Sequence, residues 1–566
     1  QQLNIISDNQ KNKLSSVLSN LNNCVSVLGK RNFKNQLLNP TKNIEKLNKE
    51  YDIIDYITNA NNIIHDVRNK LKYVSDTDYL LRKITTNKSY PRDLYKLYIS
   101  FDSLKDVRDD IIGNNNHTIL KYIYSHHITH DIFQTSLNEL LTEIDNKLNI
   151  KMCDITDIKI EDIGLIKDGY DSEYDKMKTD YKNKNDLIRT IICELNRFLK
   201  IEFGDNTDYI QEHVYEKNAC DLKITSSRTD KVTALITRMA KHHSSAPIIT
   251  FNINSSPYSI DFRDLVFKKK DKTNNIIHHK LINDTYEELY SLKNKLVSFT
   301  TKVFADILDN LVLKYYDKIE RLSSVIGIID ATICKAYNSK KMNYCKPIIQ
   351  EHDKSFVNVK GLRHQLIEQL LDNEVYVSND IELGKDKNGL LLYGTNAVGK
   401  TSFIRALGIS VIMAQAGMYV PAESFVYNPY SSIYSRILGN DNLFKGLSTF
   451  QVEISELRTI EKYADKNSLI LGDEICSGTE HDSALCINAC GLIHLNNVNS
   501  TYIFATHLHE LVDIEEVNAL EKLYVKHMTV VYDNERGDLI YERKFKDGSG
   551  DRTYGLEVIK SVLSKK

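Results

Sequence analysis

The segment GLLLYGTNAVGKTSFIRALG, residues 389–408, limits the fold more than any other part of the sequence. An apolar run precedes a loop bounded by Gly394 and Gly399, and a helix-like run follows, so we expect the strand, loop and helix of an α/β domain. The loop fits the pattern G-x-x-x-x-G-K-[ST], in which backbone N–H groups converge on phosphates. Lys400 would reach the β- and γ-phosphates of a nucleoside triphosphate, and the Thr401 hydroxyl would hold Mg²⁺. An ordinary glycine turn is the alternative, and the flanking strand and helix favour the phosphate-binding loop.

Two further apolar runs end in groups that suit nucleotide hydrolysis. NSLILGDEICSGTE predicts a buried strand ending at Asp473 and Glu474. Asp473 would anchor Mg²⁺, and Glu474 would orient or deprotonate the attacking water. TYIFATHLHEL predicts a strand ending at Thr506 and His507, and His507 would contact the γ-phosphate as a sensor. The alternatives are an acidic turn and a structural histidine, but the upstream phosphate-binding loop favours the functional interpretation.

A fourth motif, GLSTFQVEISEL at residues 446–457, precedes the acidic strand by about one helix. Ser448 and Thr449 are predicted N-caps, with Glu453 early in the following helix. A hydroxyl-bearing helix start also binds anions. In ATPases whose two strands end with Asp-Glu and His, this position completes the nucleotide pocket of the opposite subunit. The motif therefore predicts either a dimer that encloses two ATP molecules or a plain N-cap.

The distribution of glycine divides the chain. Only seven of the 22 glycines precede residue 380, and the whole chain has seven prolines, so the first two-thirds should be mainly helical. The run LNELLTEIDNKL, residues 137–148, places its apolar residues on one helical face. Residues 285–337 contain no proline and one glycine, which predicts a long helical rod. The last third should contain strands, turns and loops.

Residues 204–284 differ from the helices around them. They include Pro247, Pro257 and the β-prone runs APIITFNI and SPYSIDF, which predict a small inserted β-rich unit. The segment FKKKDK also lies there and supplies the candidate DNA contacts Lys268, Lys269, Lys270 and Lys272. The lysines indicate either contact with nucleic-acid phosphates or a solvated surface loop.

Composition narrows the class of protein further. The chain has 74 Lys and Arg against 76 Asp and Glu, a net charge of −2 that neither requires nor excludes nucleic acid. Nine cysteines without a C-x-x-C pair favour a reducing compartment over a disulfide or zinc framework. The runs HHITH and CINAC have metal-compatible spacing but too few ligands for a usual site. With no apolar run of the ~18 residues that a span needs, we expect no membrane contact. We expect an intracellular protein, with nucleus, mitochondrion and viral factory left open.

The last third resembles the ATPase domain of the MutS family of DNA mismatch-repair proteins. The matching runs are GTNAVGKTS, AQAGMYVPAES, GLSTFQVEISEL, SLILGDEICSGTE, ATHLHEL and YGLEVIK, in family order and near family spacing. The resemblance continues upstream through VKGLRHQLIEQ, IKDGYDSEYDKMK and GKRNFKNQLLNPTKNIEKLNKEYDII. It is weakest over residues 60–150 and 205–285.

The resemblance implies a multidomain chain, an α-helical core and lever with an inserted β-rich clamp, followed by an α/β P-loop ATPase domain of the ABC type. The implied divisions are a helical core and first lever arm at 1–203, a DNA clamp at 204–284, returning lever helices at 285–345 and the ATPase domain at 346–566. It also implies ATP and Mg²⁺ as cofactors and double-stranded DNA as a partner. A homodimer or a heterodimer within the family would form through the ATPase domain.

The resemblance also assigns individual residues. Tyr376 occupies the position of an aromatic residue that stacks on adenine, with His527 opposite it, although an aromatic residue in an extended run is usually part of the core. The nucleotide-binding residues that it implies are Gly394, Asn396, Gly399, Lys400, Thr401, Ser402, Ser448, Tyr376 and His527. The implied catalytic residues are Lys400, Glu474 and His507, and the implied Mg²⁺ residues are Thr401 and Asp473.

The sequence departs from the family pattern in three places. Val398 replaces a glycine before the P-loop lysine, and an arginine is missing from the loop that follows the acidic pair, CSGTE at residues 476–480. The missing arginine puts in doubt an arginine role in coupling at that loop. The pattern DEICSGTE resembles the branch found in giant viruses and octocoral mitochondria. The mismatch-reading domain has no counterpart, and because the chain starts at Gln1 we expect it to lie further upstream.

We therefore expect a DNA-binding ATPase that acts as a dimeric sliding clamp in mismatch repair. A related clamp on branched or recombining DNA is an open alternative, because the discriminating domain is missing. A distant ABC-type ATPase is another. A membrane transporter would need a transmembrane partner and a glycine-rich signature that GLSTFQVE lacks. A chromosome-organising ATPase would separate its motifs by a very long coiled coil, whereas Gly394 and His507 are 113 residues apart (507 − 394).

Overall fold

The structure is a computed structural model of the whole chain. It describes residues 2–7, 14–60, 62–113, 116–126, 128–155, 157, 159–160, 162–214, 220–241, 248–253, 256–371, 374–395, 398–437, 449–476, 479–533 and 538–550. The chain forms two compact units, and each is described by itself. Unit 1 comprises Gln1–Asp78, Asp102–Phe133 and Glu320–Lys566, and unit 2 comprises Tyr79–Phe101 and Gln134–Ile319.

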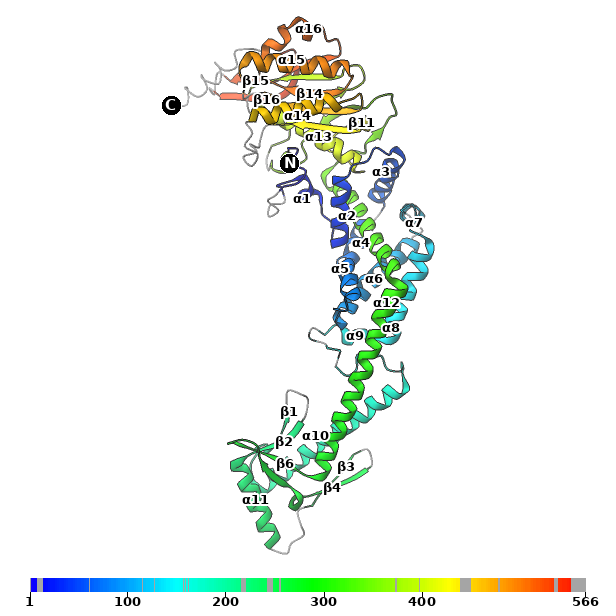
Figure 1. Cartoon of the computed structure of the whole chain (residues 1–566), viewed down its shortest axis with the longest axis vertical. Coiled ribbons are helices and arrows are strands. Elements are labelled where there is room, and N and C mark those ends of the chain that lie inside the picture. The colour runs from blue at the N-terminus through cyan, green and yellow to red at the C-terminus, as the bar shows by residue number, and fades with distance from the viewer. Residues whose placement is uncertain are drawn as a thin grey trace, which may run out of the picture. The chain divides into compact units, whose positions relative to one another are not determined.

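The N-terminal part of unit 1 is helical (Figure 1, blue). Its helices are α1 (Val17–Leu21), α2 (Val27–Leu38), α3 (Ile44–Asn59), α4 (Ile63–Leu71) and α7 (His117–Tyr124), together with the last part of α12 (Lys280–Met342). Two glycines allow α2 and α12 to approach closely. A Cβ atom on Gly29 would overlap Asp330, and one on Gly327 would lie 3.3 Å from the Leu28 carbonyl oxygen. Asp330 accepts hydrogen bonds from the N–H and hydroxyl of Ser26, the N-cap of α2, at 2.7 and 2.6 Å.

A six-stranded sheet organises the C-terminal part of unit 1. Its strands are β10 (Gly389–Tyr393), β12 (Ser432–Arg436), β13 (Ser468–Asp473), β14 (Thr501–Ala505), β15 (Leu523–Asp533) and β16 (Asp538–Asp547), in the order β12-β13-β14-β10-β15-β16. All neighbours are parallel except β15 and β16. Every residue of β10, β13 and β14 is buried, which explains their continuous apolar runs.

Helices cover both faces of this sheet (Figure 1). α13 (Lys400–Gln415) packs closely, because a Cβ atom on Gly408 would lie 2.6 Å from a methyl of Leu471 in β13. α14 (Thr449–Tyr463), α15 (His481–Asn497) and α16 (Glu515–Asn518) share a core with the alternate residues Leu391, Ile470 and Phe504. Alternation along each strand thus separates the two helical layers.

A second sheet in unit 1 has the order β7-β11-β8-β9. Its strands are β7 (Ile348–Ile349), β8 (Phe356–Leu362), β9 (Asn379–Leu383) and β11 (Ser424–Asn428). Short 3₁₀ segments occupy Ile367–Gln369 and His509–Asp513.

Unit 2 combines helices with antiparallel strands. β1 (Ile210–Val214), β2 (Cys220–Thr225), β5 (Val266–Lys269) and β6 (Asn274–His278) form a sheet of order β1-β2-β6-β5, and β3 (Ile248–Ile253) pairs with β4 (Ser256–Asp261). The helical elements of this region are α5 (Thr77–Thr85), α6 (Pro91–Gly113), a π-helical segment at Asp131–Ser136, α8 (Leu137–Lys147), α9 (Ile150–Cys153), α10 (Ser172–Phe203), α11 (Ser226–Lys241) and a 3₁₀ turn at Phe262–Asp264. α5, α6 and the π-helical segment cross the boundary into unit 1.

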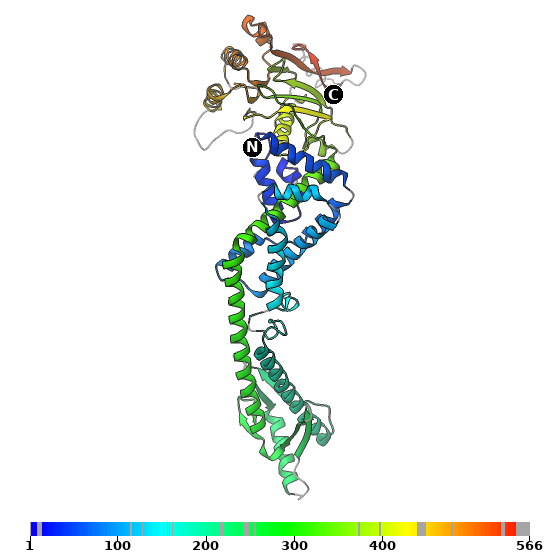
Figure 2. The same cartoon turned by 90° about the vertical axis from the view of Figure 1, so that its right-hand side faces the viewer.

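The start of α12 runs beside α10 in unit 2 (Figure 2). The rings of Tyr174 and Phe299 stack at 5.1 Å between centroids, and one core contains residues of both helices and of the strands. The rod expected over residues 285–337 is a single 63-residue helix, α12, which contributes to both units. The apolar stripe at residues 137–148 is buried, as its periodicity predicts. Within the part of the chain that the structure describes, no helix is both long and apolar enough to cross a membrane.

Candidate nucleotide site

The loop between β10 and α13 requires its two glycines. Gly394 has φ 148° and Gly399 has φ 118°, both in the region that side chains disfavour. A Cβ atom on Gly394 would also come within 2.9 Å of Val398. Among the described residues no side chain caps α13, which begins at Lys400, so its first backbone N–H groups are available to an anion. Asn396, the other loop residue assigned from the sequence, lies outside the described residues.

Lys400 is turned back into the loop and is only 3 % exposed. Its Nζ donates to the carbonyl oxygens of Gly394 at 2.7 Å and Thr395 at 3.2 Å, and it lies 3.3 Å from His507 Nε2. Burial lowers the pKa of Lys400, and the carboxylates of Glu474 and Asp473 oppose that shift. A buried ammonium group held by neutral carbonyl oxygens and an imidazole is well prepared to bind phosphate oxygens.

Thr401 and Asp473 form a second pair at the start of α13. The Thr401 hydroxyl donates to Asp473 Oδ2 at 2.6 Å. Asp473 is 4 % exposed, and its Oδ1 has no hydrogen-bond partner among the described residues. Burial raises the pKa of Asp473, while the Thr401 hydrogen bond lowers it. A buried carboxylate oxygen without a donor fits a hydrated Mg²⁺, which is usually held by one or two carboxylates together with phosphates.

Glu474 and His507 meet at the ends of β13 and β14. His507 Nε2 lies 2.8 Å from Glu474 Oε1. Glu474 has φ 49° and Cys476 has φ 61°, so the turn after β13 holds two residues in the left-handed region, an arrangement that often marks functional sites. Burial lowers the pKa of His507, as does the nearby Lys400, whereas Glu474 opposes the shift.

The sheet topology explains why these groups meet. Lys400 follows β10, Asp473 and Glu474 end β13, and His507 follows β14, while the sheet order places β14 between β13 and β10. The carboxyl ends of parallel strands share one edge, where ligands of open α/β sheets bind. The structure therefore brings together five residues proposed from the sequence, Lys400, Thr401, Asp473, Glu474 and His507.

The other nucleotide candidates are placed less directly. Tyr376 precedes β9 and is mostly buried, which raises its pKa to about 12. His527 lies in β15, paired with Tyr393 of β10, and its Nδ1 is 3.0 Å from the Gly548 carbonyl oxygen. Ser402 lies in the first turn of α13. Their contact with a nucleotide stays a prediction, and Ser448 lies outside the described residues.

The lysine cluster lies on the β5–β6 hairpin of unit 2. Lys268 and Lys269 are exposed on β5, Lys272 is exposed in the turn, and Lys270 is half-buried. Asp271 lies among them and accepts hydrogen bonds from the N–H groups of Thr273 and Asn274. These bonds hold the pKa of Asp271 well below its usual range, so the cluster includes one fixed negative charge. Its contact with DNA stays a prediction.

Sequence reasoning missed an ion pair that fixes α14. Arg436, at the end of β12, is 8 % exposed and lies 2.6 Å from Glu453 and 3.3 Å from Glu456. Glu453 is visible in the motif GLSTFQVEISEL, but nothing in the sequence marks Arg436 as its partner.

A buried polar network at the other end of α13 was also missed. Lys335 Nζ donates to Glu50 at 2.7 Å and to the Ala416 carbonyl oxygen at 3.1 Å, so α12 and α3 both reach the end of the P-loop helix. Tyr51 donates to the Ala414 carbonyl oxygen at 2.7 Å. Burial alone would raise the pKa of Glu50, but Lys335 and neighbouring hydrogen bonds lower it to about 2.

The candidate metal runs give no site among the described residues. No group of three His, Cys, Asp or Glu side chains gathers in the described part of the chain. His126 Nδ1 lies 3.0 Å from the Tyr122 carbonyl oxygen, and His127 is outside the described residues.

Comparison with known proteins places these observations in a family. Residues 390–564 match MutS domain V, and residues 1–336 match MutS domain III. The chain is 30 % identical to a DNA mismatch repair protein mutS homolog from Acanthamoeba polyphaga mimivirus, over 100 % of this chain and 53 % of the relative. It is 29 % identical to a mitochondrial mutS homolog from Sarcophyton glaucum, with the same two coverages. It is 25 % identical to MutS of Alkaliphilus oremlandii, over 97 % of this chain and 57 % of the relative.

The chain therefore spans about half the length of the curated relatives that it matches. The predicted resemblance to a giant-virus and octocoral mitochondrial branch is confirmed by these relatives.

Proposed function

Because this chain belongs to the MutS family of DNA mismatch-repair proteins, we propose that it is an ATP-hydrolysing, dimeric DNA clamp that acts in mismatch repair. MutS domain V is the ATPase domain of MutS proteins, and it matches the α/β part of unit 1. The observation that carries the proposal is the gathering of Lys400, Asp473, Glu474 and His507 at one edge of the sheet.

ATP and Mg²⁺ would use the polar groups that gather at this edge of the sheet. Lys400 would exchange two loop carbonyls for phosphate oxygens. Thr401 and Asp473 would hold Mg²⁺, which supplies charge neutralisation for phosphoryl transfer when it is bound. Glu474 would orient or deprotonate the attacking water, with His507 fixing its carboxylate and contacting the γ-phosphate. Gly394, Asn396, Gly399 and Ser402 would complete the phosphate loop.

The proposal also includes contacts to adenine and a dimer, which rest on the family resemblance. Tyr376 and His527 would enclose the base, and Ser448 would complete the nucleotide pocket of the partner subunit. Arg436 would fix the orientation of α14, because it holds Glu453 near the start of that helix. Either a second copy of this chain or another family member could supply the partner.

DNA would bind through the lysine cluster on the β5–β6 hairpin, Lys268, Lys269, Lys270 and Lys272, with contacts to phosphates rather than to bases. α12 contributes residues to both units, and it also holds Lys335 against the end of the P-loop helix. A change in the nucleotide site could therefore reach the clamp through α12, as the lever of the proposed machine. We infer a cycle in which ATP closes the dimer and hydrolysis resets it.

The decisive experiment measures steady-state ATP hydrolysis by the full chain with and without duplex DNA, at low and moderate salt. The DNA panel contains matched, mismatched and four-way-branched duplexes, which separates a mismatch-repair clamp from a clamp for branched DNA. We expect hydrolysis that DNA changes, and Lys400→Ala should abolish hydrolysis as the control for a contaminating ATPase. Hydrolysis that no DNA changes at either salt would contradict the clamp, and no hydrolysis in the wild-type chain would contradict the ATPase.

A further inference from the structure

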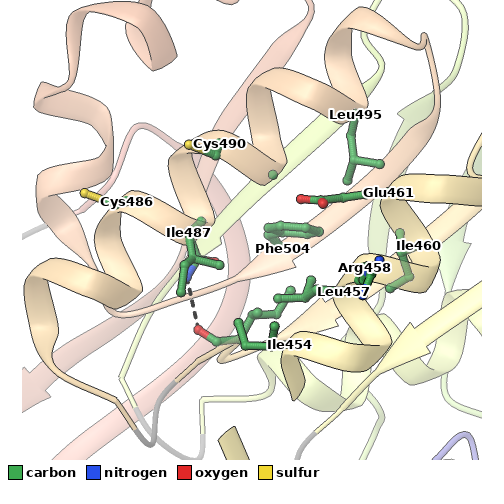
Figure 3. A pocket seen from close by; sticks show the side chains of 13 residues that line it. Ile454, Leu457, Arg458, Ile460, Glu461, Cys486, Ile487, Cys490, Leu495 and Phe504 are labelled. Carbon is green, nitrogen blue, oxygen red and sulfur yellow. Dashed lines mark hydrogen bonds between the residues drawn. The ribbon is translucent and has the colours of Figure 1, made fainter. Parts of the chain in front are cut away.

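An apolar cavity of about 400 Å³ lies between α14 and α15, on the face of the sheet opposite α13. Ile454 and Leu457 line it from α14, Ile487 lines it from α15, and Phe504 of β14 forms its floor (Figure 3). Its volume falls within the range of small-molecule sites, about 300–1,000 Å³, and its lining is mainly apolar with a few polar groups at the edge. Neither the nucleotide chemistry nor the lysine cluster uses it.

The polar groups at the edge define what could enter. Arg458 and Glu461 of α14 line the cavity and are exposed, so the polar end of a ligand could face them while its apolar part lies on Phe504. Cys486 and Cys490 of α15 also line it and are exposed (Figure 3). These thiols can be alkylated, so their reaction rate reports access to the cavity.

The floor of the cavity is continuous with the hydrolytic groups. Ile475 lines the cavity and directly follows Glu474, and Phe504 lies three residues before His507. The Glu474 N–H donates to the Ala505 carbonyl oxygen at 2.9 Å, next to Phe504.

α15 also contacts the turn after β13 that contains Glu474 and Ile475. Asn488 Nδ2 donates to the Ile475 carbonyl oxygen at 3.0 Å. Gly472 permits the packing beneath, because a Cβ atom there would lie 2.5 Å from the Ile475 side chain and 3.0 Å from Phe504. Contacts made inside the cavity therefore bear on the backbone that carries Glu474 and His507.

We propose that this cavity binds a small molecule with an apolar body of up to three rings and a polar end, and that its occupancy slows hydrolysis without competing for nucleotide. The ligand lies between α14 and α15 and fixes Ile475 and Phe504 in place, which limits movement of the acidic turn. The binding of a ligand in this cavity does not depend on any activity of the chain. The slowing of hydrolysis rests on the proposed ATPase function.

Gly491 offers a matched pair of variants. It lines the cavity, and among the described residues a Cβ atom there would meet Phe504 alone, at an ordinary contact distance of 3.9 Å. Gly491→Ala therefore fits, whereas the longer side chain of Gly491→Leu should project into the cavity and fill it. Circular dichroism and thermal unfolding check that both variants fold, and Ile487→Phe replaces Gly491→Leu if the latter does not.

The binding experiment titrates the full chain with 1-anilinonaphthalene-8-sulfonate and follows its fluorescence. We expect Gly491→Ala to bind as the wild type does and Gly491→Leu to bind at least about tenfold more weakly. The bound probe should also slow alkylation of Cys486 and Cys490, measured by mass spectrometry, while exposed Cys193 of unit 2 reacts at an unchanged rate. Equal binding by the wild type and Gly491→Leu, or unchanged alkylation of Cys486 and Cys490, would overturn the site.

Hydrolysis and nucleotide binding are measured on the same samples. A saturating probe should lower the hydrolysis rate of the wild type and of Gly491→Ala but leave their affinity for a fluorescent ATP analogue unchanged. Probe binding with an unaltered hydrolysis rate would overturn the regulation while the site stands. A chain that binds the probe but never hydrolyses ATP would overturn the proposed ATPase and the regulation that rests on it, and not the cavity.

Discussion

His507 Nε2 lies 2.8 Å from Glu474 Oε1, so the ends of two neighbouring strands are joined through the side chains that we assign to hydrolysis. A backbone hydrogen bond also joins the two strand ends, because the Glu474 N–H donates to the Ala505 carbonyl oxygen. The acid and the histidine are therefore coupled through a side-chain contact and a backbone hydrogen bond. This coupling determines what single substitutions should do at the site.

Glu474→Gln should retain ATP binding and lower the single-turnover rate of hydrolysis by about 10²–10⁴-fold. The amide cannot take a proton from water, whereas Lys400 and the loop carbonyls are unchanged. Quench-flow measures turnover, and a fluorescent analogue measures binding. Glu515→Gln, an exposed glutamate on α16, is the matched control. Wild-type turnover in Glu474→Gln would show that Glu474 has been assigned the wrong role.

Thr401→Val should lower the apparent affinity for Mg²⁺, measured through hydrolysis, by about 10- to 100-fold. Thr401→Ser should keep an apparent affinity near that of the wild type. Only the serine keeps the hydroxyl that donates to Asp473. The measurement is hydrolysis against Mg²⁺ concentration, with EDTA expected to stop it. Equal Mg²⁺ curves for the valine and serine variants would remove Thr401 from the metal site.

The pKa of His507 should lie below its ordinary value of 6.5, because burial and Lys400 both disfavour the imidazolium. Lys400→Met should raise that pKa, and Glu474→Gln should lower it further, since Glu474 favours the charged form. The fall in wild-type hydrolysis that follows protonation of His507 should therefore have its midpoint below pH 6.5. The histidine resonances in NMR titrations report each shift, and a wild-type value above 6.5 would contradict the electrostatic account.

Lys335→Met should destabilise unit 1 at pH 7 by about 3–5 kcal/mol, because it leaves the buried Glu50 carboxylate without its cation. The folded pKa of Glu50 is lowered from 4.5 to about 2, so its contribution is fully present above pH 4.5 and is lost as the pH falls toward 2. The difference in free energy of unfolding between the wild type and the variant should accordingly be smaller at pH 3 than at pH 7. Denaturant midpoints at both pH values test this, and a larger difference at pH 3 would contradict it.

Replacement of Lys268, Lys269 and Lys272 by Ala should weaken duplex binding and reduce the slope of log K against log salt by about 0.9 for each DNA phosphate that the variant no longer neutralises. The control replaces Lys176, Lys182 and Lys295, which are exposed in the same unit. Fluorescence anisotropy over a salt series measures both sets. Equal slopes for the two triple variants would mean that the hairpin is only a solvated loop.

The nucleotide site could be predicted because its chemistry is carried by local runs of sequence. Lys400 and Thr401 follow one loop. The apolar runs before Asp473 and His507 predict buried strands, so the position of each polar group at a strand end is also predicted. Parallel pairing then brings these groups together, which follows from strand–helix alternation. The long helix over residues 285–337 was visible for the same reason, since it contains no proline and a continuous apolar periodicity.

The features that were missed depend on contacts between distant segments. Arg436 meets Glu453, 17 residues further along the chain, because α14 packs on β12, and Lys335 meets Glu50 across 285 residues. Such pairs leave no periodic trace in a single sequence. The cavity beside α15 was equally invisible, because its walls are ordinary core residues that leave space only after packing.

The buried network at the end of α13 has a consequence for what can be separated from this chain. Tyr51 and Lys335 donate hydrogen bonds to the Ala414 and Ala416 carbonyl oxygens, so residues outside the matched segment 390–564 complete the P-loop helix. A fragment cut at the family boundary would lose these donors and expose the surface that α3 covers. The segment 390–564 should therefore be less stable by itself than within the full chain.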